Sequence, residues 1–218
     1  NVTVGGSSLA DRNLISGNAG VAGEGWGIEI YNSASGAIIR GNYIGTTATG
    51  TGVLANNGPG VRVFDSATGA RIGGVNAGEG NVIVGNSTRG VWIELGTGTS
   101  VLGNTIHGNG ALGIDLATSG VLTNDSGDGD TGANGKQNYP VLTKAVTTGN
   151  LVEITGTLNS NANSYFRVEF FSSATADQTS TKATAVTACG RQTGTRQRSR
   201  ISSTQARATS AYSVNSRL

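Results

Sequence analysis

A four-residue unit, Gly-apolar-x-apolar, recurs through the first half of the chain and limits what the chain can fold into. Its copies begin at Gly27, Gly60, Gly90 and Gly113, so successive copies lie 33, 30 and 23 residues apart. In a β-strand, the two apolar residues of each unit point to the same face. A repeat of about 20–50 residues is typical of solenoids, whose coils bury apolar residues on their neighbours. The unit therefore predicts one strand of a solenoid coil.

A second unit, Asn-x-Ile, recurs out of phase with the first. Its asparagines would occupy one corner in successive coils and bond their side-chain amides along the solenoid axis. Its isoleucines would form one buried column. The copies are Asn13 and Ile15, Asn42 and Ile44, Asn81 and Ile83, and Asn104 and Ile106. A third short apolar segment lies between the two units, at residues 37–39, 70–72 and 99–101.

Three short strands per period predict an all-β fold, a parallel β-helix of about five turns over residues 1–118. The chain contains 36 glycines in 218 residues, and tight corners between strands favour glycine because they need positive φ. The shortest period is the bare coil, and the longer periods carry loops at residues 46–57 and 75–80. An open β-sandwich with coincidental spacing is the alternative fold.

Composition excludes several classes of protein. The single cysteine, Cys189, excludes an internal disulfide and most thiolate metal sites. No apolar run approaches the roughly 18 residues that a membrane span needs, so we expect no membrane span. The sequence shows no signal peptide and contains no methionine, which suggests a mature form or a fragment.

Several segments together resemble a bacterial secreted repeat module, the right-handed parallel β-helix repeat of the pectin-lyase-like superfamily. The segments are NLISGN, GNYIGT, GEGNVIVGN, GIDL and NDSGDGDTGANGKQNYPVL, and the resemblance covers about residues 1–172. It implies a right-handed β-helix, an extracellular or cell-surface location and frequent action on polysaccharides. Many members of such repeat modules have no known activity. The superfamily's hydrolase signature, several Asp residues with a neighbouring His and Arg, is not found in this chain.

Four regions follow along the chain. We expect the β-helix over residues 1–123, an acidic Gly- and Asn-rich loop over 124–140, and short strands of a partial cap over 141–177. The strands of the cap should lie near residues 150–158 and 165–172, where apolar and polar residues alternate. The fourth region, residues 178–218, is rich in Thr, Ser and Arg.

Charge separates this tail from the rest of the chain. Residues 1–177 carry a net charge of −5, whereas residues 178–218 carry +7 and contain no acid. A basic tail can bind nucleic acid, but this one offers only Tyr212 for base stacking, so we expect no nucleic-acid partner. Related modules carry an acidic, aromatic stretch at this point. The hypothesis that explains the difference is a one-base frame slip near residue 178.

The acidic loop concentrates oxygen ligands and glycines within eleven residues, from Asn124 to Asn134. Calcium takes six to eight oxygen ligands, and glycine lets the backbone fold around the ion. We therefore expect Asp125, Asp128 and Asp130 to hold Ca²⁺. The spacing lacks the closing Glu of an EF-hand, and the alternative is an acidic turn that closes the end of the solenoid.

Aligning the Gly-apolar-x-apolar units places outward residues in two columns. One column reads Glu29, Arg62, Trp92 and Asp115, and the next reads Tyr31, Phe64, Glu94 and Ala117. Aromatic rings offer flat apolar area to sugars, while carboxylates and Arg bond hydroxyls or acidic sugars. We therefore expect Glu29, Tyr31, Arg62, Phe64 and Trp92 to bind a polysaccharide. The alternative is an ordinary half-exposed sheet in which Arg62 pairs with Glu29 and Trp92 covers its neighbours.

Glu94 and Asp115 are the candidate catalytic pair. Glycoside hydrolysis needs two carboxyl groups roughly 5–10 Å apart, which residues on adjacent coils and neighbouring columns can provide. A lyase would need a base such as Arg62 and a Ca²⁺ ion. His107, the only histidine, should point outward near a corner and is more often a surface residue than a catalyst. No Gly-x-Ser-x-Gly elbow or phosphate-binding loop occurs.

Two classes of function remain open. The first is an extracellular polysaccharide-active protein, either a glycoside hydrolase or a lyase. The second is a non-catalytic cell-surface, adhesion or carbohydrate-binding module, in which the solenoid serves as a rigid platform. Exposed ends of a solenoid invite pairing, so a homodimer through the ends is a further expectation.

Overall fold

The computed structural model describes residues 1–21, 24–117, 120–148, 151–162, 166–169, 186–187 and 215–216. Most of the tail that we expected to be frame-slipped, residues 178–218, therefore lies outside the described residues. Within them the fold is almost entirely β, and the two 3-10 helices are short: η1 at Leu9–Asp11 and η2 at Ala133–Lys136. No helix in this described part is long and apolar enough to cross a membrane.

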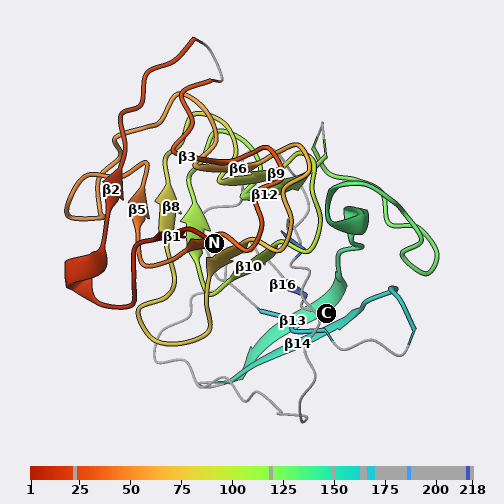
Figure 1. The fold of residues 1–218 in the computed structure, drawn as a ribbon. Helices are drawn as coiled ribbons and strands as arrows, with labels where there is room; N and C mark the ends of the chain where they lie inside the picture. The colour runs from red at the N-terminus through yellow and green to blue at the C-terminus, as the bar shows by residue number, and fades with distance from the viewer. Residues whose placement is uncertain are drawn as a thin grey trace.

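Twelve short strands form three parallel sheets of four strands each, and every coil contributes one strand to each sheet (Figure 1). Sheet A contains β1 (Thr3–Val4), β4 (Ile38–Ile39), β7 (Arg71–Gly73) and β10 (Ser100–Leu102). Sheet B contains β2 (Leu14–Ile15), β5 (Tyr43–Ile44), β8 (Val82–Val84) and β11 (Thr105–His107). Sheet C contains β3 (Ile28–Ile30), β6 (Val61–Val63), β9 (Val91–Ile93) and β12 (Ile114–Leu116).

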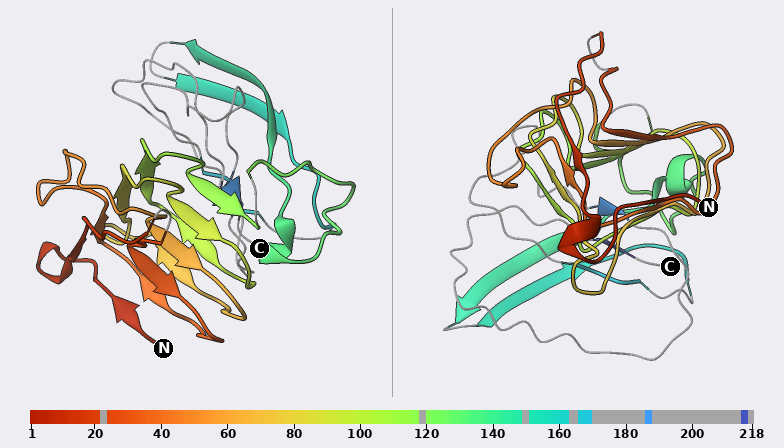
Figure 2. Two further views of the ribbon diagram at one scale, coloured as in Figure 1. Left: turned by 90° about the horizontal axis from the view of Figure 1, so that it is seen from above. Right: turned by 60° about the vertical axis from the view of Figure 1, so that its left-hand side comes forward.

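The predicted parallel β-helix is confirmed. Figure 2 shows corresponding strands of successive coils lying side by side, in colour order from red to green. We number the coils 1 to 4, so that coil 1 holds β1, β2 and β3, and coil 4 holds β10, β11 and β12. Four coils carry a strand in all three sheets, where the sequence predicted about five turns.

The register matches the alignment of the sequence units residue for residue. In sheet C, Val61 pairs with Ile28 on one side and with Val91 on the other. In sheet B, Ile44 pairs with Ile15 and Ile83, so the isoleucines do form one column. Because like residues stack at equal phase, each coil buries its apolar side chains on those above and below it.

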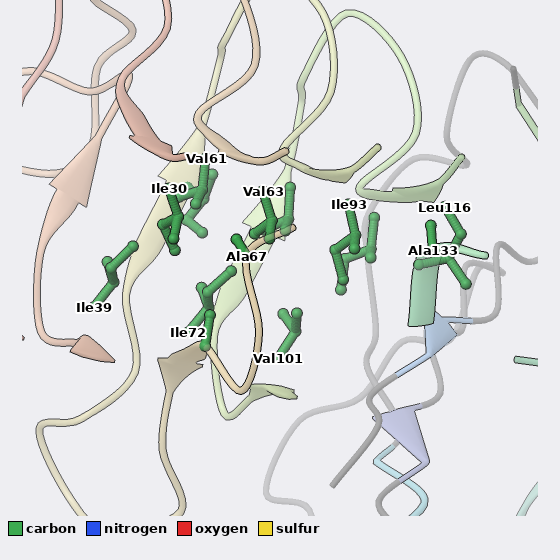
Figure 3. Close-up of a cluster of buried hydrophobic side chains, with 14 of the residues drawn as sticks. Ile30, Ile39, Val61, Val63, Ala67, Ile72, Ile93, Val101, Leu116 and Ala133 are labelled. Carbon is green, nitrogen blue, oxygen red and sulfur yellow. The ribbon is translucent and has the colours of Figure 1, made fainter. Parts of the chain in front are cut away.

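The core runs along the axis of the helix and is built mainly from Val and Ile (Figure 3). Buried residues from all three sheets meet there, and Ile72, Ile83, Val61, Val63 and Val101 are fully buried. Branched side chains fit this position because the strands are short and their inward residues pack on a pleated surface. Beyond coil 4, Ala133 of η2 joins the same cluster.

Asparagine side chains form ladders at two corners. The predicted ladder is confirmed: Nδ2 of Asn42 donates to Oδ1 of Asn81 at 3.0 Å, and Nδ2 of Asn81 donates to Oδ1 of Asn104 at 2.8 Å. Each side chain also serves the backbone, since Oδ1 of Asn81 accepts from the N–H of Asn42 at 2.9 Å. The ladder thus satisfies polar groups that the corner would otherwise bury without partners.

A second ladder, which the sequence analysis missed, lies between sheets B and C. Nδ2 of Asn56 donates to Oδ1 of Asn86 at 2.8 Å, and Nδ2 of Asn86 donates to Oδ1 of Asn109 at 2.9 Å. The Gly-Asn pairs ending at Asn86 and Asn109 were visible as a repeat. Asn56 follows Ala55 at the end of an inserted loop, so the series appeared broken at coil 2.

Close backbone approach explains the glycine that opens each unit in coils 1 to 3. A Cβ atom added to Gly60 would lie 2.8 Å from the carbonyl oxygen of Gly90, and one added to Gly90 would lie 2.5 Å from that of Gly113. These glycines do not have positive φ. The expectation that corners need left-handed glycines holds elsewhere, as at Gly45 and Gly73, whose φ angles are +84° and +81°.

Two antiparallel strands, β13 (Val141–Thr148) and β14 (Leu151–Thr157), follow the acidic loop. β14 lies where the sequence predicted a strand at residues 150–158. Residues 166–169 are not in a strand, so the described part of the strand predicted at 165–172 is absent. A further parallel pair joins β15 (Val186–Thr187) to β16 (Asn215–Ser216).

Replacing Asn81 by Leu should unfold the solenoid at lower urea concentration. The change removes Oδ1 of Asn81, which accepts from the backbone N–H of the buried Asn42. Leaving that N–H without an acceptor should cost about 1–3 kcal/mol. Asn13→Leu is the matched control, because Asn13 is the exposed first member of the same ladder and donates to Asn42 alone. Equal losses of unfolding free energy in the two variants would contradict an axial ladder.

Candidate functional site

The outward residues of sheet C form the richest polar and aromatic surface that the sequence pointed to. Registered pairing places Glu29, Arg62, Trp92 and Asp115 in one column, one residue from each coil. The second predicted column lies two residues later, directly after each strand ends, at Tyr31, Phe64, Glu94 and Ala117. We call these eight residues the Arg62 face, because Arg62 contacts residues from coils 1, 2 and 3.

Arg62 is the centre of an ion-pair network. Its Nη1 donates to Oε1 of Glu29 on coil 1 at 2.8 Å, and its Nε donates to Oε2 of Glu94 on coil 3 at 2.8 Å. Nη2 bonds the same oxygen of Glu94. The Arg62 side chain is only 12% exposed, so these charge-assisted bonds are partly shielded from water.

Aromatic rings surround the same guanidinium group. The Cζ atom of Arg62 lies 4.1 Å from the ring centroid of Phe64, 4.7 Å from that of Trp26 and 5.2 Å from that of Trp92. These distances fall within the range of cation–π contacts. The rings of Phe64 and Trp92 therefore contact a cation, and their predicted role in binding sugar stays a prediction. This agrees with the alternative expectation that Arg62 pairs with Glu29 and Trp92 covers its neighbours.

Tyr31 is the aromatic residue of this face that remains most open. Its ring stacks on Phe64 with centroids 5.7 Å apart and planes 10° from parallel, yet the residue is 53% exposed. Tyr31 follows the edge strand β3, and no strand among the described residues pairs with β3 on the side away from coil 2. The ring thus offers flat apolar area that is held in place from one side.

Asp115 lies at the other end of the column and is almost fully buried, at 2% exposure. Its Oδ2 accepts from Nε of Arg89 and, at 3.4 Å, from the N–H of Gly120. No donor among the described residues reaches its buried Oδ1. Burial raises the pKa of the Asp115 carboxyl, and the hydrogen bond and charge of Arg89 offset only part of that rise.

The structure holds the two predicted catalytic carboxyls in different environments. Glu94 is ion-paired with Arg62, and Asp115 is buried against Arg89. A buried carboxyl cannot contact a glycosidic oxygen without movement of the groups that cover it. Catalysis by this pair therefore stays a prediction.

Trp26 and Arg89 are two residues of the network that the sequence analysis missed. Arg89 lies over Trp92, with its Cζ atom 4.3 Å from the ring centroid. Both residues precede the glycine of a Gly-apolar-x-apolar unit, Gly27 and Gly90 respectively. A third column, read one residue before each unit, would have revealed them.

Carboxylates of the acidic loop accept hydrogen bonds from protein donors, except at the buried Oδ1 of Asp125, which no donor among the described residues reaches. Oδ1 of Asp128 accepts from the N–H of Asn138 at 2.7 Å, and its Oδ2 accepts from Nε2 of Gln137 at 2.6 Å. Oδ2 of Asp125 accepts from the N–H of Gly129 at 3.0 Å, and Asp130 pairs with Lys136 at 3.8 Å. These contacts close the loop on itself.

No group of three or more His, Cys, Asp or Glu side chains in the described part of the chain is arranged to hold a metal ion. Both oxygens of Asp128 are already bonded to protein donors, so calcium would have to replace those bonds. Calcium binding by Asp125, Asp128 and Asp130 therefore stays a prediction. His107 is exposed on β11, as expected.

Neither a family model, nor a curated protein, nor a solved structure matches this chain.

The raised pKa of Asp115 predicts how stability depends on pH. A carboxyl that holds its proton more tightly when folded stabilises the protein fully below its unfolded pKa of about 4, and this contribution is lost as pH rises through the raised folded pKa. The unfolding free energy of the wild type, relative to Asp115→Asn, should therefore fall as pH rises above about 4. Urea unfolding of both proteins across this range measures the difference. A difference that stays constant with pH would show that burial does not raise the pKa of Asp115.

Proposed function

We propose that this chain is an extracellular polysaccharide-binding β-helix module, and that the Arg62 face is its binding surface. The observation that carries the proposal is the half-exposed Tyr31 ring, stacked on Phe64 beside the Glu29–Arg62–Glu94 network. An aromatic ring that is fixed and open on one side suits the apolar face of a sugar. Charged groups next to it suit the hydroxyls around the rim of the same sugar.

Rigidity supports a binding role over a purely structural one. Arg62 bonds residues from neighbouring coils on both sides, and Phe64 holds the Tyr31 ring in place. A preformed surface loses little conformational entropy on binding. The resemblance of the repeats to the secreted bacterial β-helix modules of the pectin-lyase-like superfamily supports the extracellular location and the polysaccharide ligand.

A glycoside hydrolase is the second candidate, and the raised pKa of Asp115 favours it. Acid–base hydrolysis needs a carboxylic acid whose pKa is raised, together with a second carboxyl group. In this role Asp115 would donate the proton and Glu94 would act as base or nucleophile. Burial of Asp115 against Arg89 argues against the role, because it separates the acid from solvent.

Replacing Tyr31 by Ala should weaken binding to the best ligand of a polysaccharide array by about tenfold or more, which corresponds to about 1.4 kcal/mol. The change removes the exposed stacking ring and leaves the core untouched. Tyr43→Ala is the matched control, because Tyr43 lies on sheet B, outside the Arg62 face. The Cζ atom of Arg12 lies 4.0 Å from the centroid of the Tyr43 ring. If both variants bind like the wild type, the Arg62 face is not the binding surface.

Release of reducing ends or unsaturated products from the bound polymer separates the two candidates. A binding module releases neither, with or without Ca²⁺. A hydrolase releases reducing ends, and Glu94→Gln combined with Asp115→Asn should slow it by about 100-fold or more. Activity that persists in the folded double variant would mean that other residues carry the chemistry.

A further inference from the structure

We propose that the Arg62 face binds a neutral glycan and discriminates against glycans that carry carboxylates. This inference rests on the proposed function and adds the chemical class of the ligand. The charged residues of this face lie on the outer side of sheet C, away from the core. The decisive question is whether either arginine of the network can receive an acidic sugar.

Arg62 is already bonded to carboxylates of its own chain. Three of its N–H groups donate to Glu29 and Glu94, on the coils to either side. The faces of Phe64, Trp26 and Trp92 lie close to the same group. Arginine recognises carboxylates by aligning two N–H groups with two oxygens, and the edge that would do so here, Nε with Nη2, faces Glu94.

Arg89 is likewise bonded to a carboxylate of its own chain. Its Nε donates to Asp115, which is 2% exposed, and its guanidinium group lies over Trp92. Breaking this pair would leave a buried carboxyl without its cation, which is strongly unfavourable. An acidic ligand therefore gains no partner at Arg89 unless a buried contact is lost.

The balance of charge points the same way. The network contains three carboxyl groups and two guanidinium groups, and every guanidinium has a carboxylate partner. A carboxylate placed beside Tyr31 would approach Glu29, whose side chain is 26% exposed. Like charges at short range repel. Sugar hydroxyls, in contrast, can donate to carboxylate oxygens while the ring stacks on Tyr31.

The test uses oligosaccharides that differ in charge alone. Hexasaccharides of galacturonan, glucuronan and mannuronan are each compared with their carboxyl-reduced forms, in which every acid has become a neutral hydroxymethyl group. Neutral hexasaccharides of glucose, mannose and xylose complete the panel. Calorimetry on the full chain should find a neutral ligand. Each carboxyl-reduced form that binds should do so about tenfold or more tightly than its acid, a difference of about 1.4 kcal/mol.

The outcomes separate this inference from the proposed function. If an acid binds as tightly as its reduced form or more tightly, the inference fails while the polysaccharide-binding function stands. If no member of either set binds, the proposed function fails and the inference fails with it. Affinity for the neutral ligand should also be insensitive to salt between 50 and 500 mM, roughly Debye lengths of 14 and 4 Å, whereas binding through a cation would weaken.

A gain-of-function variant tests the cause. Glu29→Gln combined with Glu94→Gln removes both carboxylates that hold Arg62, so the guanidinium group becomes available to a ligand. The variant should bind the acidic hexasaccharides about tenfold more tightly than the wild type does, so the preference for the carboxyl-reduced forms should disappear. Tyr31→Ala in the same background should reduce both affinities. Unchanged discrimination in the folded variant would show that the Arg62 pairs do not set the ligand charge.

Discussion

The alignment of each coil over the next is the constraint on which this structure depends. A corner of a β-helix buries peptide groups that cannot pair within a strand, and asparagine supplies both a donor and an acceptor to satisfy them. In the first ladder, Asn42, Asn81 and Asn104 pass hydrogen bonds from coil to coil, and Asn81 is 1% exposed. Displacing one coil would leave these polar groups without hydrogen-bond partners along several coils. The ladders therefore hold the strands in register, and the register places every outward residue.

The Arg62 face is a consequence of that register. Glu29, Arg62 and Glu94 are about thirty residues apart in the sequence, yet they form one network because their coils are stacked. The aromatic residues nearby divide into two kinds. Phe64 and Trp92 cover guanidinium groups and stabilise the face, whereas Tyr31 remains open. The sequence suggested that all three aromatic residues were equally exposed to a sugar. In the structure, only the Tyr31 ring of these three is largely exposed.

Burial gives the two ends of this face different chemistry. At the end near coil 1, Tyr31 and Glu29 lie near solvent, while at coil 4 Asp115 is enclosed with Arg89. The open end suits binding, because its groups can contact a ligand without rearrangement. The enclosed end explains the raised pKa of Asp115, since loss of water penalises the charged carboxylate more than Arg89 favours it. The same residue supplies the main argument for catalysis and the main argument against it.

The sequence alone determined the repeating part of this protein. Identical units at equal phase fold in identical ways, so the strands, the isoleucine column, the first asparagine ladder and the outward columns could all be read from spacing. Breaks in spacing hid the second ladder at Asn56. Only the tertiary structure decided which partner each outward side chain takes. The sequence left Arg62 available to a ligand. In the structure it pairs with Glu29 and Glu94, because long side chains on adjacent coils reach one another across the strands. Burial of Asp115 likewise depends on Arg89 and on chain beyond the last coil, which no repeat encodes.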